Sequence, residues 1–549
     1  MINCKALESD ILVIGAGIAG CCAALEAGLA GKKVTLISKI PPLHAHSVSA
    51  RGGINVSINE SDAAAHIKDT LEAGDGIGNK DAIKMMCENA PTHLLWLEKL
   101  GVHFSKNDSG TYQNKAFGGS KIARACFSKD RTGLAIMITL IKQIKKNPNI
   151  TLLDQMMAVK LLRYERQILG AQVFHLRDTR CYKFLANAVI LATGGGLNVY
   201  QQNTNAVSTT GDGLALAIEV GAALRDMEFV QFHPLGLRKT GIQIPEPVLA
   251  AGGRILDASG ARLLERFYPD KLELAGRDKV SIAIAKELIK NPQNELFLDL
   301  SNVPKDKEYA IKEAEKIAET FLNVDIKQHK VSIAPSAHYL MGGVSSDIEC
   351  HALDHQYGIV NGLYVAGEAA CNGVHGANRM GGNSLLEVVV FGRKAGRNAA
   401  KYSANKPVIS EKTTLLDIPF GKNNLDIGEI TQRLKSSMSK NAAVIRCAKS
   451  LDDQIAIIEQ LKMMLCEYKI NDSSLRYNPQ IKQYFELKSL LTISSAICYA
   501  AKQRQESRGA HYRTDFENSR DYAGVNSVVY KNDNGLLQSG LVKEKLGEE

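Results

Sequence analysis

Three glycines near the N-terminus have the spacing of a turn that binds phosphate groups. They are Gly15, Gly17 and Gly20, in the order Gly-x-Gly-x-x-Gly. In this pattern the first glycine allows a tight turn, the second lets the backbone approach a pyrophosphate, and the third lets a helix pack closely on a strand. The phosphates then lie at a helix N-terminus, where unpaired N–H groups point outward. The spacing predicts a dinucleotide site built mainly from backbone groups.

The elements needed to hold this turn lie on both sides of it. Residues 10–15 form an apolar run that predicts a buried strand, a helical run follows to Leu29, and residues 33–38 predict a second strand. This is the strand–turn–helix–strand order that the glycine pattern requires. One feature departs from it, because the second strand ends in Ser38 and Lys39 and offers no acidic residue to the ribose hydroxyls.

Two later strands favour FAD as the nucleotide. Residues 189–196 predict a strand that ends in Thr193 and three glycines, which suits a second close approach of the backbone to a cofactor. Residues 362–368 predict another strand, which ends in Gly367 and Glu368. Because these strands are far apart in the sequence, we expect one nucleotide-binding domain that is interrupted by an insertion.

The composition is that of a globular protein with more than one domain. The chain has 549 residues, of which 45% are hydrophobic and 23% are charged. About two to four domains are expected at this length. The net charge of +9 is small for the length, and basic residues are interspersed with acidic ones. This pattern argues against nucleic acid as a partner.

Cysteine spacing and the N-terminus bear on the compartment. None of the eleven cysteines forms a C-x-x-C pair, so we expect no zinc site or cysteine-ligated cluster in this chain, but buried thiols in a reducing compartment. Residues 1–10 are charged and lead directly into a strand, which does not resemble a signal peptide. No apolar run has the length needed to span a bilayer. We expect a cytoplasmic chain that meets a membrane only through partners.

Seven further segments resemble motifs of the succinate dehydrogenase/fumarate reductase flavoprotein family, in the family order. The longest reads His375-Gly-Ala-Asn-Arg379-Met-Gly-Gly-Asn-Ser384-Leu-Leu-Glu387. The resemblance extends from about residue 8 to about residue 525. The segments are residues 44–55, 116–119, 229–234, 274–278, 338–343, 375–387 and 506–513.

The resemblance implies an α/β fold with three main parts. A Rossmann-like FAD-binding domain, residues 1–230 and 338–405, is split by an inserted α+β capping domain, residues 231–337. A C-terminal helical domain follows over residues 406–530, where residues 427–469 have apolar spacing near 3.6. Residues 531–549 are expected to form a short polar tail.

The chemistry that the family implies is hydride transfer between N5 of the flavin and a carbon of a four-carbon dicarboxylate, with a proton moving at the neighbouring carbon. Such a site needs donors for two carboxylates and one rigidly held proton donor. The resemblance assigns substrate binding to Phe117, Gly118, His233, His338 and Arg379, and it assigns catalysis to Arg277, the proton donor, with Glu246, His233, His338 and Arg379.

The resemblance also implies how FAD is held. His46 matches the histidine that carries a covalent FAD bond in membrane-linked members of the family, and His44 is a nearby competitor. A bond from the flavin 8α-methyl group to a histidine nitrogen withdraws electrons and raises the flavin potential, which makes succinate oxidation feasible. The expected FAD contacts are Gly15, Ala16, Gly17, Ile18, Gly20, Ser38, Lys39, His46, Ser47, Ala50, Gly52, Gly53, Ala192, Thr193, Gly194, Asp212, Glu368, Arg379, Ser384 and Leu385. For the acids Asp212 and Glu368, helix capping is the alternative to binding cofactor hydroxyls.

Two positions depart from the family pattern within the substrate site. The family usually has a threonine that binds a substrate carboxylate where this chain has Pro245, and an arginine that links a proton relay where it has Leu249. Either Arg254 or a water replaces that arginine, or the substrate differs, or the enzyme is slow.

Two other functions fit part of the pattern. An L-aspartate oxidase shares the fold and most motifs, but it needs no partner and typically lacks the covalent histidine. A noncatalytic flavoprotein, acting in assembly or electron transfer, is favoured only by Pro245 and Leu249. The presence of both arginines and both histidines of the substrate site argues against it.

The family also implies partners and a location. An iron–sulphur subunit receives or supplies electrons, and one or more membrane anchor subunits exchange them with quinone. The chain would then lie peripherally at the cytoplasmic face of the inner or cell membrane. The direction of the reaction stays open.

Overall fold

An eight-stranded sheet forms the centre of the molecule in the computed structural model. The structure describes residues 4–57, 60–115, 122–129, 131–178, 180–290, 295–402, 418–474, 476–520, 522 and 524–543. The strand order is β16-β17-β8-β9-β1-β2-β6, with β7 also paired to β8. The strands are β1 (Cys4–Ile14), β2 (Val34–Ile37), β6 (Ile150–Leu153), β7 (Met156–Tyr164), β8 (Gln167–His175), β9 (Cys181–Leu191), β16 (His351–Leu353) and β17 (Ile359–Val365). Because β17 pairs with β9 in parallel, the expected split of the nucleotide domain is confirmed.

The glycine turn joins β1 to α1 (Ile18–Leu29) as expected from the sequence. Gly15 has a φ of +108°, and a Cβ there would lie 2.2 Å from the carbonyl oxygen of Ala192 on the neighbouring strand connection. A Cβ on Gly20 would lie 1.8 Å from the carbonyl oxygen of Gly15. Both glycines are therefore required by close backbone approach.

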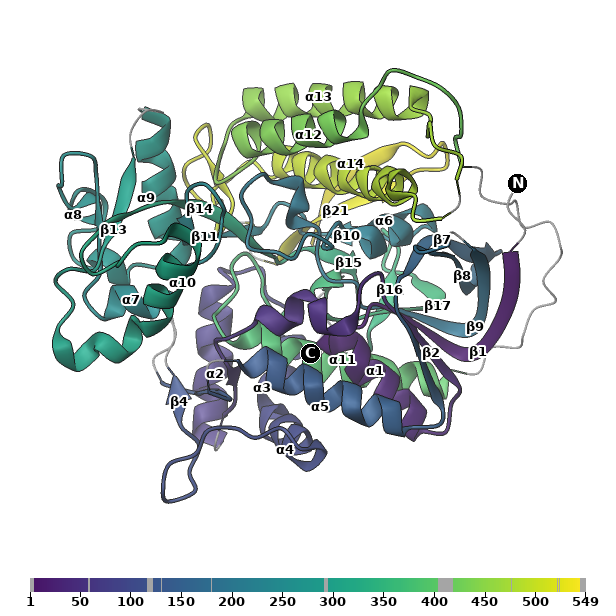
Figure 1. The fold of residues 1–549 in the computed structure, drawn as a ribbon, viewed down its shortest axis with the longest axis horizontal. Coiled ribbons are helices and arrows are strands. Elements are labelled where there is room, and N and C mark those ends of the chain that lie inside the picture. The colour runs from purple at the N-terminus through teal and green to yellow at the C-terminus, as the bar shows by residue number, and fades with distance from the viewer. Residues whose placement is uncertain are drawn as a thin grey trace.

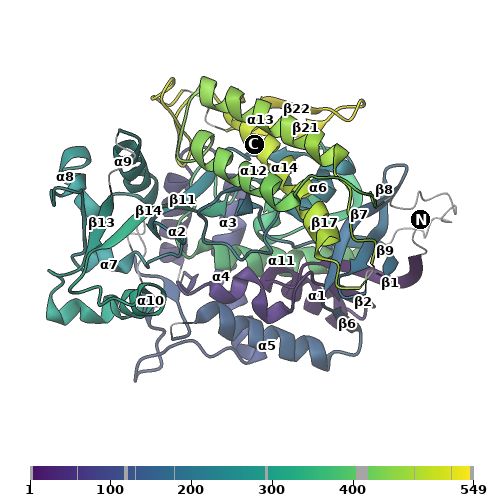
Figure 2. The same cartoon turned by 45° about the horizontal axis from the view of Figure 1, so that its top comes forward.

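Two long helices pack closely on one face of the central sheet. They are α1 and α11 (Asn383–Lys401), with α5 (Thr132–Lys146) beside α1 (Figures 1 and 2). Glycines make the contact possible, since a Cβ on Gly392 would lie 2.6 Å from the carbonyl oxygen of Ala19, and one on Gly396 would lie 2.3 Å from that of Ala23. The residues just before α11 are thereby held against the N-terminal turn.

Several further helices and two small sheets complete this part of the chain. Helices α2 (Glu60–Ala73), α3 (Lys80–Glu88), α4 (Ala90–Leu100) and α6 (Asp212–Glu219) lie between the strands in sequence. A small sheet contains β3 (Ile54–Asn55), β4 (Asn114–Lys115) and β5 (Ala125–Cys126). Another contains β10 (Leu224–Arg225), β15 (Gly343–Ser345), β18 (Ala370–Cys371), β21 (Val525–Lys531) and β22 (Leu537–Lys543).

The insertion has its own antiparallel sheet and its own hydrophobic core, at the left of Figure 1. Its strands are β11 (Val230–Leu237), β12 (Arg254–Leu256), β13 (Leu296–Asp299) and β14 (Val331–Leu340), and its helices are α7 (Pro247–Ala250), α8 (Leu263–Phe267), α9 (Arg277–Lys290) and α10 (Lys312–Leu322). The expected edges at residues 231 and 337 fall inside β11 and β14. These two paired strands connect the insertion to the rest of the chain.

The C-terminal region differs from the expectation in two details. The helical run expected over residues 427–469 is two helices, α12 (Ile427–Asn441) and α13 (Ala448–Glu467), which pack with α14 (Pro479–Gln503) at the top of Figure 1. The polar tail expected over residues 531–549 is wrong for residues 537–543, because β22 pairs antiparallel with β21. The expected boundary near residue 405 lies outside the described residues.

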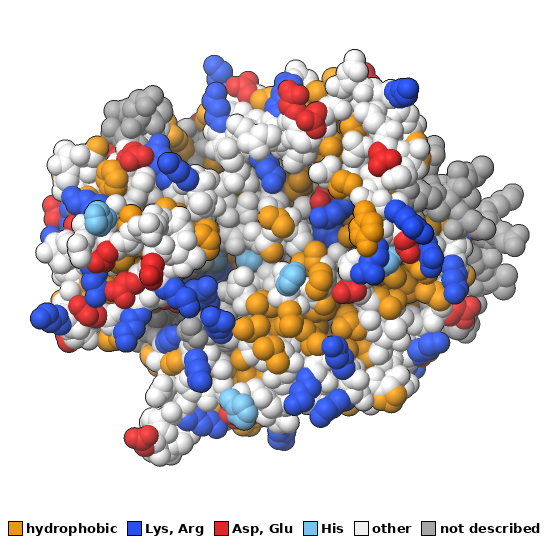
Figure 3. Space-filling view, viewed as in Figure 1, with side chains coloured by type: hydrophobic (Ala, Val, Ile, Leu, Met, Phe, Trp, Pro, Cys, Tyr) orange, Lys and Arg blue, Asp and Glu red, His pale blue; other side chains and the backbone are white. Residues whose placement is uncertain are grey.

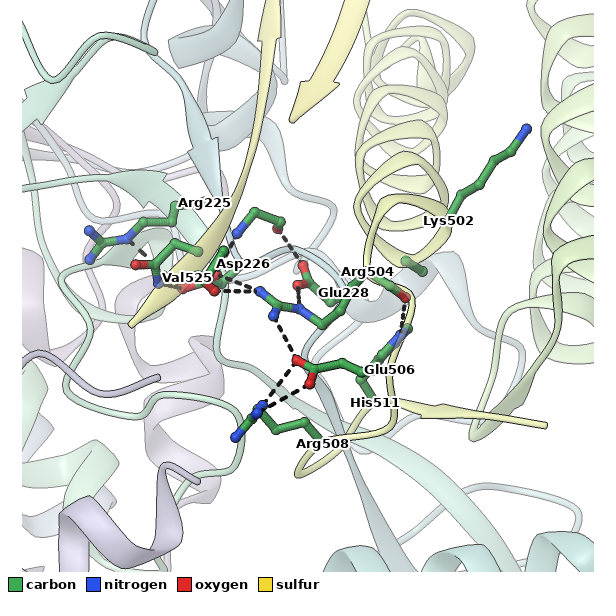
Figure 4. A network of polar contacts seen from close by, with 12 residues as sticks. Arg225, Asp226, Glu228, Lys502, Arg504, Glu506, Arg508, His511 and Val525 are labelled. Carbon is green, nitrogen blue, oxygen red and sulfur yellow. Dashed lines mark hydrogen bonds and ion pairs between the residues drawn. The ribbon is translucent and has the colours of Figure 1, made fainter. Parts of the chain in front are cut away.

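A buried ion network joins the segment after α14 to the segment after β10 (Figure 4). Arg504 Nε lies 2.5 Å from Glu228, and Arg504 Nη1 lies 3.0 Å from Glu506. Arg508 Nε lies 3.0 Å from the same Glu506 carboxylate. Burial, and then the charge of Glu228, raise the pKa of Asp226 beside this network to about 6. Charged side chains of both signs are thus paired in a buried region.

The expectation of thiols throughout the chain is wrong for one pair. Cys4 and Cys181 form a disulfide, although 177 residues separate them. They are register partners on the parallel strands β1 and β9, which bring their Cα atoms to 4.5 Å. Nine other cysteines are free, and seven of these are buried.

The surface carries charges of both signs and some exposed hydrophobic side chains. On the face in Figure 3 the basic and acidic side chains are interspersed, and hydrophobic side chains gather below the centre of the view. Among exposed hydrophobic residues, Leu43 is 45% exposed and Ile138 is 50% exposed. Within the described residues, none of the helices combines the length and the hydropathy needed to cross a membrane.

Candidate functional site

A cavity of about 650 Å³ lies where β1, β2 and β9 end, and the insertion forms part of its wall. Residues from the glycine turn, from the segment before α11 and from the insertion all line it. Of the expected FAD contacts, all but one line the cavity. Gly20 does not, because its role is the close packing of α1 on the turn.

The wall at the start of α1 fits a pyrophosphate. Gly17 precedes the first residue of α1, and no side chain caps this helix end. The backbone N–H of Ile18 lies 3.2 Å from Ser47 Oγ, and both residues line the cavity. Thr193 Oγ1 is buried without a hydrogen-bond partner at the same wall. A helix N-terminus, the Ser47 hydroxyl beside it and the unpaired Thr193 hydroxyl are suitable partners for phosphate oxygens.

Lys39 occupies the place where the usual acidic residue of this fold would be. Its Nζ lies 2.7 Å from Asp212, 2.7 Å from Glu486 and 2.7 Å from Thr210 Oγ1. Burial lowers the pKa of Lys39, but the two carboxylates outweigh burial and the net shift is upward. Asp212 does not cap α6, since Gly211 holds the N-cap position. Whether Asp212 also binds ribose stays a prediction.

Glu368 faces the cavity from the turn after β17. Burial raises its pKa to about 7, although its Oε1 accepts a hydrogen bond from the backbone N–H of Leu340 at 3.1 Å. This turn is therefore held by the end of β14. Glu368 does not cap a helix in this arrangement, since Ala366 holds the N-cap position of the short 3₁₀ turn Gly367–Ala369.

His46 lines the cavity, whereas His44 is exposed and does not. His46 Nδ1 accepts a hydrogen bond from the backbone N–H of Ala206 at 3.3 Å. Its enclosed position lowers its pKa to about 4 because burial disfavours the charged ring. The ring is thus neutral at pH 7, with its proton on Nε2. The geometry favours His46 over His44 as the residue next to a flavin.

Arg379 is a buried cation without an anionic partner. Its Nη1 donates to Ser384 Oγ at 3.0 Å and its Nη2 to Gln231 Oε1 at 3.0 Å. The guanidinium lies 4.6 Å from the ring centre of Tyr339, and its Nε has no partner. Burial, and then the charge of Arg277, lower its pKa to about 10. It makes no ion pair with any carboxylate in the described part of the chain.

Arg277 and Glu246 form an ion pair at the cavity wall. Arg277 Nε donates to Glu246 Oε1 at 2.5 Å, and Arg277 Nη1 is buried without a partner. Burial raises the pKa of Glu246, but Arg277 and His233 outweigh burial and the net shift is downward. Within the described residues Asp278, the neighbour of Arg277, does not pair with it, and its Oδ1 instead accepts from Asn378 Nδ2 at 3.5 Å. One end of the guanidinium is therefore bound, and the other is available.

His233 and His338 lie edge to face, with ring centres 5.5 Å apart. His233 is fully buried, and its Nδ1 accepts a hydrogen bond from the backbone N–H of Leu235 at 3.2 Å. Its proton therefore lies on Nε2, which is buried without a partner. Burial lowers the pKa of His233 to about 3 and that of His338 well below its usual value. Both rings are neutral hydrogen-bond donors or acceptors.

These four side chains come together from distant parts of the sequence, as the resemblance predicted. Each of His338, Arg277 and Arg379 lines the cavity. His233 contacts His338 edge to face beside it. Phe117 and Gly118 lie outside the described residues. The arrangement offers two guanidiniums and two imidazoles to an anionic ligand, and Glu246 is the lining carboxylate that bonds one of these guanidiniums in the described residues.

Comparison with known protein families matches both halves of this arrangement. Residues 10–385 match the model described as FAD binding domain, and residues 431–544 match the one described as fumarate reductase flavoprotein C-term. A succinate dehydrogenase flavoprotein subunit of Rickettsia bellii is 35% identical over 542 residues, covering 93% of this chain and 91% of that protein. The chain belongs to the succinate dehydrogenase/fumarate reductase flavoprotein family. It is an FAD-dependent oxidoreductase of this family.

Two further members of the flavoprotein family support the assignment. The fumarate reductase flavoprotein subunit of Mycobacterium tuberculosis is 33% identical over 570 residues and covers 97% of each chain. The solved structure of the quinol fumarate reductase FrdA of E. coli superposes with a TM-score of 0.92 at 29% identity, covering 99% of this chain and 98% of that one. The expected fold class is thereby confirmed over nearly the whole chain.

The two departures from the flavoprotein pattern lie side by side on the insertion. Pro245 lines the cavity beside Glu246, and Leu249 is buried in the core of the insertion. Arg254, considered as a substitute in the proton relay, is exposed on β12, so that alternative is not supported. In the described residues Glu246 is the carboxylate that contacts Arg277. The relay position at which the family has an arginine is Leu249 in this chain.

Three residues that hold the site were not predicted. Gln231 Nε2 donates to the carbonyl oxygen of Arg379 at 2.9 Å, in addition to the bond between its Oε1 and the guanidinium. Tyr339 supports the same guanidinium with its ring, and its hydroxyl donates to Glu387 at 2.8 Å. Thr204 contacts His338. The first two lie inside resembling segments and could have been suspected, but Thr204 has no such signal.

Proposed function

We propose that this chain interconverts succinate and fumarate as the FAD-carrying subunit of a larger complex. The observation that carries the proposal is a set of three buried N–H groups without partners. They are Arg379 Nε, Arg277 Nη1 and His233 Nε2, which have no partner among the residues that the structure describes. Buried donors normally find acceptors, so the set is suited to a ligand that brings its own. A dicarboxylate supplies four acceptor oxygens, and its negative charge would compensate the positive charge of Arg379.

Each side chain then has a separate task. FAD, when bound, supplies a hydride acceptor or donor at N5. Arg379, His233 and His338 bind the carboxylates and fix the position of the dicarboxylate. In the direction of fumarate reduction, Arg277 Nη1 gives a proton to the carbon next to the one that receives the hydride, and succinate forms. Glu246 accepts a hydrogen bond from Arg277 Nε at 2.5 Å, and it is placed to take up a proton from solvent and pass it to Arg277 after the transfer.

A dye-linked assay tests the proposed reaction. The FAD-loaded chain is expected to oxidise succinate with an electron-accepting dye, or to reduce fumarate with a reduced dye. Protein from which FAD has been removed is the control. Absence of both activities in a chain that retains FAD would contradict the proposal. Oxidation of L-aspartate without any succinate oxidation would favour the aspartate oxidase alternative.

We further propose a covalent bond between FAD and His46. On a denaturing gel the wild-type chain is expected to retain flavin fluorescence, because a covalent bond survives unfolding. His46→Ala is expected to lose this fluorescence, and His44→Ala, the matched control two residues away, is expected to keep it. A wild-type band without flavin would rule out the bond, and a fluorescent His46→Ala band would move it to another residue.

An iron–sulphur subunit and a membrane anchor are proposed as partners, at the cytoplasmic face of the membrane. Two similar solved structures are described as quinol-fumarate reductase with menaquinol and as Mycobacterium smegmatis Sdh1 with UQ1. The exposed Leu43 supports a partner near the flavin, because it is three residues before His46 and lines a groove with Ile138 and lysines of α5. Copurification of the chain with such subunits tests this proposal.

A further inference from the structure

A short segment, residues 203–206, lies between the two histidines that face the cavity. The backbone N–H of Thr204 donates to the carbonyl oxygen of Ala337 at 2.9 Å, and Asn205 Nδ2 donates to the carbonyl oxygen of His338 at 3.1 Å. At its end, Ala206 donates its N–H to His46 Nδ1. The segment therefore fixes the backbone of β14 next to His338.

Thr204 also contacts the imidazole itself. Its Oγ1 lies 2.9 Å from His338 Nδ1. Within the described residues the Thr204 hydroxyl and the His338 ring make no other hydrogen bond, so His338 Nε2 has no partner there. A neutral imidazole carries one proton, so the direction of this hydrogen bond decides what Nε2 can do.

The two directions have different consequences. If the Thr204 hydroxyl donates to Nδ1, the ring proton lies on Nε2, and His338 can donate to a carboxylate. If Nδ1–H donates to Thr204, the hydroxyl hydrogen is left without an acceptor among the described residues, and the Nε2 lone pair faces the proposed carboxylate site. The first direction satisfies more groups and avoids repulsion between a lone pair and a carboxylate.

We infer that Thr204 is a positioning residue that fixes His338 in the tautomer with its proton on Nε2, and thereby makes it a carboxylate donor. The inference rests on the proposed function for the identity of the anion. It follows the pattern of the other two rings, since His233 and His46 each accept at Nδ1 from a backbone N–H. His338 differs because its donor is a side chain, which a substitution can remove.

The test uses the FAD-loaded chain and Thr204→Val, which keeps the shape of threonine but has no hydroxyl. A saturated three-carbon dicarboxylate is the probe, because it binds as a dianion and has no adjacent carbons to desaturate. Thr204→Val is expected to raise its Kd about 10- to 100-fold, and Thr204→Ser to restore it to within about 3-fold of wild type. Folding of each variant is checked by thermal unfolding.

Nitrogen NMR on ¹⁵N-histidine-labelled protein supplies the second readout. In wild type the acceptor nitrogen of His338 is expected to be Nδ1, and in Thr204→Val part of the population is expected to shift to the other tautomer. His233 is the internal control, because Leu235 fixes its tautomer in both proteins. His338→Gln identifies the His338 signals. If Thr204→Val does not fold, Thr204→Ala and Thr204→Ser take its place in both measurements.

The outcomes separate this inference from the proposed function. Unchanged Kd and unchanged His338 tautomer in a folded hydroxyl-free variant overturn the inference, whatever the activity. A shift of both in a chain whose wild type does not interconvert succinate and fumarate supports the inference and rejects the proposed reaction. A larger Kd without a tautomer change shows only a packing role and also overturns it.

Discussion

Replacing Arg277 with lysine is expected to reduce turnover by about 10²- to 10⁴-fold, the range that a positioned proton donor contributes. The guanidinium spans two contacts, because Nε bonds Glu246 while Nη1 faces the cavity without a partner. A lysine ammonium is a single point on its stem and cannot occupy both positions. The expected loss is therefore in kcat, since the charge beside Glu246 is kept.

The measurement combines steady-state kinetics with ligand binding. Arg277→Lys is expected to retain FAD and to bind the three-carbon dicarboxylate within about 10-fold of wild type. Arg262→Lys is the matched control, because Arg262 is also in the insertion and also bonds a carboxylate, that of Glu273, but does not line the cavity. Unchanged kcat in Arg277→Lys would remove the proton-donor role. Equal losses in both variants would point to a general disturbance of the insertion.

The parts of the fold that were predictable depend on local patterns. The turn at Gly15 was predictable because close backbone approach leaves room for no other residue. Helical structure over α12 and α13 was predictable because the apolar residues there have a helical period. The strand β22 was missed because its residues are mostly half-exposed and mix polar with apolar side chains, and it is held by its pairing with β21. The Cys4–Cys181 bond was missed because sequence spacing does not reveal which strands are neighbours.

The functional site likewise has parts that the sequence predicted and parts that it did not. The arginines and histidines were found because each lies in a segment that resembles the family, but the resemblance does not state what holds them. That Glu246 bonds Arg277 directly, and that Arg254 is exposed, follows from the tertiary packing of the insertion. Thr204 acts through a single hydroxyl contact between residues 134 positions apart, which no local pattern in one sequence reports.

Arg379→Gln is expected to weaken dicarboxylate binding by about 30-fold or more without lowering the stability of the ligand-free, FAD-loaded protein. The reason is the absence of a counter-charge, since the guanidinium is 6% exposed and bonds only neutral groups in the described residues. A buried cation without a partner costs free energy in the unliganded state, and glutamine removes that cost. Loss of a charged, buried contact to the ligand costs about 2–5 kcal/mol of binding, which is roughly 30-fold or more in Kd.

Arg504→Gln is the matched control, because it makes the same substitution at another buried guanidinium, which is paired with Glu228 and Glu506. Removing one partner of a buried ion pair leaves the other uncompensated, and a loss of about 3–5 kcal/mol in unfolding free energy is expected there. Thermal unfolding with and without the three-carbon dicarboxylate measures both effects. The ligand is expected to raise the unfolding temperature of wild type. Arg379→Gln is expected to have the ligand-free unfolding temperature of wild type or a higher one, and no rise with the ligand. Arg504→Gln is expected to have a lower unfolding temperature than wild type without the ligand. If Arg379→Gln destabilises the unliganded protein as much as Arg504→Gln does, then Arg379 is a structural cation, and the dicarboxylate site must be sought elsewhere in the cavity.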